Sequence, residues 1–186
     1  MMDTNNFDPR SVDVATFARR GGCVSGTSAL AELARLCDEA HPEARPDAGD
    51  ELRWQVTGES RAVRGGGAEI WLHLKADAGL ALVCQRCLQP VVAGLRVERS
   101  FRFVADEHQA LAIDADIEED VLVLSRTFDV IELVEDECLL ALPLVPRHEV
   151  CPQPLTVAPD PIGLEERKNP FEVLGELKLQ RKPSLG

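Results

Sequence analysis

Aromatic side chains are scarce in this chain of 186 residues, which contains no tyrosine, two tryptophans and six phenylalanines. Proteins that bind single-stranded nucleic acid often stack the bases on exposed aromatic side chains. With so few aromatic residues, we do not expect base-stacking surfaces. Any direct contact with nucleic acid is expected to depend on cationic side chains that neutralise phosphates.

Long apolar runs are also absent. No window approaches the roughly 20 apolar residues that a membrane-spanning helix needs, and the start, MMDTNNFDPRS, lacks a basic segment followed by an apolar one. We therefore expect a cytoplasmic protein that does not contact a membrane. In a reducing compartment, the six cysteines are expected to be buried thiols, metal ligands or transient redox groups, because disulfides are rare there.

The motifs of common active sites are missing as well. The sequence has no serine elbow, no glycine-rich phosphate loop and no H-E-x-x-H zinc motif. We therefore predict that the protein is not an enzyme and has no small-molecule substrate.

The net charge of -12 is unevenly distributed along the chain. Residues 106–149 contain 13 acidic and 2 basic side chains, which gives -11, whereas the other residues contain 19 acidic and 18 basic side chains, which gives -1. The balanced part can form local basic patches. The acidic part is expected to attract basic proteins by long-range electrostatic steering.

Apolar periodicity predicts an α+β fold with a mainly antiparallel sheet that could close into a barrel. Alternation with a period of two over residues 52–56, 70–74 and 95–103 indicates strands, with a turn at Gly65–Gly67. Arg99 falls on the apolar side of its strand, which indicates a bulge or a strand edge at that residue.

Two helices are predicted in the same domain. Apolar residues spaced by three and four from Leu30 to Cys37 indicate an N-terminal helix, with Ser28 as its N-cap. Asp129 and Glu132 form a capping box, which predicts a helix over residues 130–141. The acidic, weakly periodic residues 105–120 between the strands and this helix are expected to form a solvated, mobile excursion.

We divide the chain into two parts on these patterns. Residues 1–151 are predicted to form a single α+β domain that contains the C-x-x-C motif. Residues 152–186 are predicted to form a proline-spaced linker followed by a short C-terminal helix, with Asn169 as its N-cap.

Cys84 and Cys87 lie two residues apart in a predicted bend between two strands, in the sequence LVCQRCLQP. A tight turn of this kind can direct two thiolates at one metal ion, while backbone amides of the turn stabilise the sulfurs. A closed zinc site needs four ligands, and the H-x-x-C pair His148 and Cys151 could supply the other two. The sequence therefore predicts a zinc site with three sulfur ligands and one nitrogen ligand.

Two other interpretations of these residues stay open at this point. The four residues could be ordinary small or polar residues in turns. Alternatively, Cys84 and Cys87 could form a dithiol redox pair or sensor. A thioredoxin-type pair needs its first cysteine at the N-terminus of a helix, whereas here a strand precedes the bend and another follows it.

Four blocks of the sequence together resemble the YceD family, the large ribosomal RNA subunit accumulation proteins. These blocks, in chain order, are ARRGG, CQRCLQP, LVEDECLLALPLVPRHEVC and NPFEVLGELK. The resemblance implies a bacterial, non-enzymatic protein needed for accumulation of 23S ribosomal RNA, and hence for large-subunit biogenesis. Residues carried over from the family are Cys84, Cys87, His148, Cys151, Asp136, Glu137, Pro143 and Pro146.

Such a protein could contact ribosomal RNA or act through ribosomal proteins. Basic residues on the polar sides of the predicted strands, at the bend and beside His148 are candidates for RNA or partner contact, although scattered solubilising charge would look similar. They are Arg53, Arg61, Arg64, Lys75, Arg86, Arg96, Arg102 and Arg147. A metal-stabilised scaffold with an unrelated partner is a further interpretation.

Overall fold

The computed structural model describes residues 7–114, 117, 119–152 and 171. The chain divides at Pro154 into two units, and all the described residues except Phe171 belong to the first. The predicted C-terminal helix and its N-cap Asn169 lie outside the described residues, and the predicted domain boundary after residue 151 stays a prediction.

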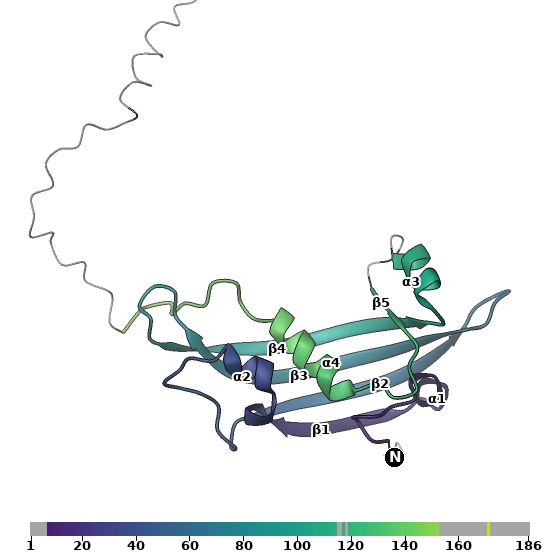
Figure 1. Ribbon diagram of the computed structural model, residues 1–186, viewed down its shortest axis with the longest axis horizontal. Helices are drawn as coiled ribbons and strands as arrows, with labels where there is room; N and C mark the ends of the chain where they lie inside the picture. Colours follow the sequence, from purple (N-terminus) through teal and green to yellow (C-terminus); the bar gives the residue numbers. More distant parts are fainter. Residues whose placement is uncertain (1–6, 115–116, 118, 153–170, 172–186) are drawn as a thin grey trace, which may run out of the picture. The chain divides into compact units, whose positions relative to one another are not determined.

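The first unit is built on a five-stranded sheet with the order β1-β2-β3-β4-β5. The first four strands pair antiparallel in chain order, and β5 pairs parallel with β4. β1 and β5 are the two ends of this order, so the sheet is open and the predicted α+β class holds without closure into a barrel (Figure 1). The strands are β1 (Cys23–Ala29), β2 (Glu51–Ala62), β3 (Ala68–Val83), β4 (Pro90–Val104) and β5 (Asp120–Val123).

The period of two in the sequence correctly identifies the central strands. In β2, Leu52, Trp54 and Val56 are buried and their neighbours along the strand are more exposed. Pairing of β3 with β4 continues through Arg99 without a bulge, and β5 begins to pair with β4 only at Phe101. Arg99 therefore lies at a strand edge, which is one of the two predicted outcomes.

Among the described residues, helices cover one face of the sheet and leave the other uncovered. Figure 1 shows α2 and α4 on the same face, where α1 packs on β2 and β3 and α4 packs on β3 and β4. The helices are α1 (Val14–Arg19), α2 (Ala34–Asp38), α3 (Glu107–Asp114) and α4 (Val130–Leu140), with a 3-10 turn, η1, at Leu30–Glu32. Within the described residues, no helix has the length and apolar character needed to cross a membrane.

The N-terminal part of α4 is formed as predicted. The Asp129 side chain accepts hydrogen bonds from the backbone N–H groups of Ile131 and Glu132, which makes it the N-cap. The apolar stripe of α4 lies on the core, with Ile131, Val134 and Cys138 buried.

The predicted N-terminal helix is shorter than expected and is capped differently. Ser28 lies in β1, and its hydroxyl accepts a hydrogen bond from the Trp54 indole, so it is not an N-cap. The amides of Arg35 and Leu36, in the first turn of α2, donate instead to the carboxylate of Glu135 on α4, at 2.8 and 3.2 Å. Capping rules consider only residues that are close in the sequence, so they could not identify Glu135 as the partner of these amides.

The segment 105–120, which was predicted to be a solvated, mobile excursion, contains regular secondary structure. Its first half forms α3, and its last residue starts β5, which joins the sheet beside β4. Tertiary packing therefore imposes structure on a segment whose apolar periodicity is weak.

Steric constraints favour glycine at both glycine positions of the ARRGG block. Gly21 has a φ of 59°, in the left-handed region that favours glycine. A Cβ on Gly22 would lie 2.4 Å from the ring of Phe17, the buried aromatic residue of α1. These glycines let the chain leave α1 and enter β1 directly against that ring.

Candidate metal centre

The bend that joins β3 to β4 contains both cysteines of the C-x-x-C motif. The strands stay paired up to Val83 and Pro90, and the residues between them form a turn closed by a hydrogen bond from the Leu88 N–H to the Cys84 carbonyl at 2.8 Å. We call residues 84–89 the cysteine bend. Cys84 and Cys87 are both buried, at 0% and 3% exposed.

The segment after α4 brings the second pair of predicted ligands to this bend. The Gln85 N–H donates to the Pro146 carbonyl at 2.9 Å, which places the chain from 146 to 151 against the bend. We call this segment the 146–151 loop. The Cys84 and Cys151 sulfurs lie 3.9 Å apart, and the Cys87 sulfur lies 3.4 Å from Nδ1 of His148.

All four ligand atoms lie within 4.8 Å of one another, so the cluster could hold a metal ion. Around a tetrahedral zinc ion with ordinary bond lengths, two sulfurs are about 3.8 Å apart, and a sulfur and a nitrogen are about 3.6 Å apart. The two contacts given above are close to these separations. The donor set of three thiols and one imidazole is also one that structural zinc sites use.

The orientation of His148 leaves its Nδ1 atom available to bind a metal ion. Its Nε2 atom lies 3.1 Å from the Pro90 carbonyl oxygen, to which only a protonated Nε2 can donate. The remaining ring nitrogen, Nδ1, then carries the lone pair and faces Cys87. A backbone carbonyl that fixes the tautomer in this way is a common outer partner of metal-binding histidines.

Backbone amides activate one of the thiols. Burial by itself raises the pKa of Cys84, but the N–H groups of His148, Arg86 and Cys87 point at its sulfur and bring the pKa down to about 5. The pKa of Cys87 is raised instead, by burial and by the neighbouring sulfurs of Cys84 and Cys151. The cluster therefore accepts one thiolate readily and resists further negative charge unless a cation is present.

Arg86 connects the two halves of the site. Its Nε donates to the Cys151 sulfur at 3.0 Å, and its Nη2 donates to the carbonyl oxygens of His148 and Glu149, each at 3.1 Å. Arg86 is one of the basic residues predicted to contact RNA or a partner, and the structure adds this role in holding the 146–151 loop.

Buried His41 also holds the cysteine bend, and no pattern in the sequence identified it. Its Nδ1 accepts the Glu43 N–H at 3.1 Å, and its Nε2 lies 3.0 Å from the carbonyl oxygen of Leu88. Leu88 has a φ of 61°, which is unusual for leucine, and this hydrogen bond fixes the strained turn. No spacing rule could find His41, because its partner is a backbone carbonyl.

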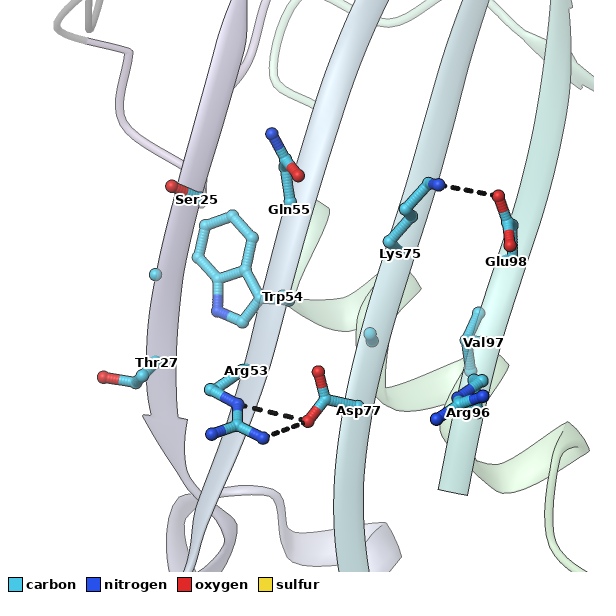
Figure 2. A pocket seen from close by; sticks show the side chains of 12 residues that line it. Ser25, Thr27, Arg53, Trp54, Gln55, Lys75, Asp77, Arg96, Val97 and Glu98 are labelled. Atoms are coloured by element: carbon cyan, nitrogen blue, oxygen red, sulfur yellow. Dashed lines mark hydrogen bonds and ion pairs between the residues drawn. The ribbon is translucent and has the colours of Figure 1, made fainter. Parts of the chain in front are cut away.

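Most of the other predicted contact residues lie on the uncovered face of the sheet, where Arg53, Lys75 and Arg96 line a depression of about 730 Å³. Figure 2 shows Arg53 paired with Asp77, and Lys75 paired with Glu98, across neighbouring strands. Arg61 and Arg102 are also paired, with Glu59 and Glu69. Within the described residues, Arg64, Arg96 and Arg147 form no ion pair and are exposed.

Comparison with known proteins agrees with the resemblance seen in the sequence. A family model described as large ribosomal RNA subunit accumulation protein YceD matches residues 72–178. A Haemophilus influenzae protein named large ribosomal RNA subunit accumulation protein YceD is 33% identical over 175 residues, covering 91% of this chain and 95% of the relative. No solved structure matches the chain.

Proposed function

This chain belongs to the YceD family, and we propose from this membership that it supports accumulation of the large ribosomal RNA subunit. We propose that it acts in the cytoplasm as a non-enzymatic assembly or stabilising factor, so that 23S ribosomal RNA persists long enough to enter large subunits. The observation that carries this proposal is the likeness to a protein of that name over nearly the whole length of both chains.

We further propose that Cys84, Cys87, His148 and Cys151 bind a structural zinc ion. Three thiolates and one imidazole would complete the coordination of the ion, leaving no position for a substrate. Zinc would neutralise the thiolates and join the cysteine bend to the 146–151 loop. Apparent binding energies of structural zinc in small domains are about 10 to 16 kcal/mol at neutral pH, and this energy is coupled to folding.

The eight basic residues identified in the sequence remain our candidates for contact with RNA or a partner. Four of them on the uncovered face are paired with carboxylates, so that face carries little unbalanced positive charge. Arg64, Arg96 and Arg147 are the strongest candidates, because each is exposed and forms no ion pair among the described residues. The weak positive charge of the sheet face favours contact through ribosomal proteins over direct contact with RNA.

Deletion and complementation in a bacterium that carries this gene test the proposal. Loss of the gene is expected to lower the ratio of 23S to 16S ribosomal RNA and to reduce large subunits in sucrose gradients. The wild-type gene should restore both, whereas a Cys84→Ser and Cys151→Ser double variant should not. An unchanged RNA ratio in the deletion strain would show that the proposed function is wrong.

A dithiol redox role is the second candidate, and the lowered pKa of Cys84 is the observation that favours it. This role requires a reversible disulfide between Cys84 and Cys87. Peptide mapping after mild oxidation of natively purified protein separates the two candidates. A stoichiometric Cys84–Cys87 disulfide that forms in protein containing no zinc supports redox chemistry, whereas retained zinc with both thiols reduced supports the metal site.

A further inference from the structure

β4 lies at an edge of the sheet over most of its length. β5 pairs only with Phe101–Val104, and among the described residues no backbone hydrogen bond reaches the outer side of β4 between Val91 and Arg99. We call this stretch the β4 edge. An unpaired strand edge presents N–H and C=O groups that can form a ladder with an added strand.

A groove follows the β4 edge on the helix-covered face. Two cavities, of about 600 and 390 Å³, adjoin there and share Arg99, Glu137 and Leu140. We call them together the α4 groove. Apolar side chains of three elements line it, namely Val97 and Phe101 of β4, Val121 and Leu122 of β5, and Leu133, Leu139 and Leu140 of α4. Leu140 is 77% exposed at this groove, which is unusual for a large apolar residue next to a core.

Carboxylates outnumber cations in the α4 groove. Its charged lining residues are Glu98, Asp120, Asp136, Glu137, Arg96 and Arg99, and two of the carboxylates have a cationic partner outside the lining, Lys75 for Glu98 and Arg35 for Asp136. Arg99 lies between two of the carboxylates, paired with Asp120 and 3.6 Å from Glu137. Glu137 is only 7% exposed, so its charge is poorly screened and would attract a cation that entered the groove.

These observations together define the chemistry of an occupant. An added strand places alternate side chains on opposite faces of the sheet, so every second residue would point into the α4 groove. Apolar residues of the added strand would pack against Leu133 and Leu140, and a lysine or arginine of that strand would pair with the Glu137 carboxylate. The net charge of -11 over residues 106–149, which contribute α4 and β5, adds long-range attraction for a basic chain.

We propose that the β4 edge and the α4 groove bind a basic, extended segment of another protein, which adds to the sheet as a strand next to β4. That the partner is a ribosomal protein rests on the proposed function, whereas the binding surface rests on the structure alone. A second copy of this chain is disfavoured, because two chains of net charge -12 repel each other.

A titration of the full-length protein with designed peptides tests the proposal. The probe is a nine-residue peptide with blocked ends in which valine and lysine alternate at the odd positions and threonine occupies the even ones, so that both residue types face the α4 groove, and the control peptide has glutamate in place of lysine. We expect the lysine peptide to shift the backbone amide NMR signals of Val91–Arg99 and of the last turn of α4. The glutamate peptide is expected to cause no shifts at the same concentrations.

Two variants and one matched control locate the binding site. Leu140→Lys should weaken binding of the lysine peptide by about tenfold or more, because it removes an apolar contact and adds a like charge. Glu137→Gln should weaken it in the same direction through loss of the buried carboxylate. Leu111→Lys is the control, since Leu111 is 79% exposed on α3 and does not line the groove, and it should change the affinity less than about twofold.

Three outcomes would overturn the proposal. They are equal binding of the two peptides, signal shifts confined to β1 or to the uncovered face, and a wild-type dimer in sedimentation equilibrium that Leu140→Lys converts to a monomer. The last outcome would identify a second copy as the occupant. An unchanged RNA ratio in the deletion strain would instead contradict the proposed function and leave the peptide result intact, so the two failures are distinguishable.

Discussion

The Nε2 atom of His148 lies 3.1 Å from the carbonyl oxygen of Pro90, the first residue of β4. This contact fixes the protonated nitrogen of the ring and leaves Nδ1 as the one that can bind a metal ion. In zinc-loaded protein we therefore expect His148 to bind through Nδ1. Long-range nitrogen-proton NMR spectra report which ring nitrogen binds metal, and a signal pattern typical of Nε2 binding would contradict this assignment.

Zinc content is expected to follow the four ligand residues. Cys84→Ser, Cys87→Ser, His148→Ala and Cys151→Ser should each reduce zinc, measured by elemental analysis of natively purified protein, from about one equivalent to a small fraction of it. Cys23→Ser is the control, because Cys23 lies in β1 outside the cluster. Wild-type protein should also unfold at a lower temperature after treatment with a strong chelator, and equal zinc in all five variants would refute the site.

Arg86 is predicted to position the 146–151 loop for metal binding. Its guanidinium contacts Cys151 and two loop carbonyls at the same time, which the single ammonium of lysine cannot reproduce. Arg86→Lys should therefore lower the zinc affinity by about 10- to 100-fold in a competition with a chromophoric chelator. Arg64→Lys, in an exposed turn, serves as the control and should leave the affinity unchanged.

The contact between α2 and α4 is predicted to contribute strongly to stability. The Glu135 carboxylate accepts hydrogen bonds from two backbone amides of α2 and from the Arg35 side chain. Glu135→Ala should lower the free energy of unfolding by about 2 to 4 kcal/mol, since hydrogen bonds to a charged group contribute more than neutral ones. Urea unfolding measures this change, with exposed Glu39→Ala expected to stay within about 0.5 kcal/mol of the wild type.

Acid sensitivity should depend partly on Glu59. Hydrogen bonds from Arg61 and His73 lower the pKa of Glu59 from 4.5 to about 2 in the folded protein. A folded-state pKa below the unfolded one stabilises the fold fully above pH 4.5, and this stabilisation is lost as the pH falls from 4.5 towards 2. Glu59→Gln should therefore unfold with a shallower dependence on pH across that window in urea titrations. Glu51→Gln, at an exposed position of the same strand, should retain the wild-type slope.

The sequence predicted the regular elements well where their signals are local. Strand alternation and the capping residue Asp129 depend on neighbours along the chain, so β2, β3, β4 and α4 could be identified correctly. Ser28 failed as an N-cap because the amides of α2 found a partner on another helix. The strand β5 was missed because its pairing with β4 is a tertiary contact of a short segment.

By itself, the sequence determined the residue types of the candidate metal site, the C-x-x-C spacing and the family, because these are properties of residue identity and order. Only the tertiary structure decided that the cysteine bend and the 146–151 loop meet, that Arg86 and His41 hold them, and that β4 has an edge with no pairing strand among the described residues, beside a groove that contains the buried carboxylate of Glu137. Each of these features depends on which distant segments pack together. That choice is made by burial of the whole core and is not encoded in any one stretch of the chain.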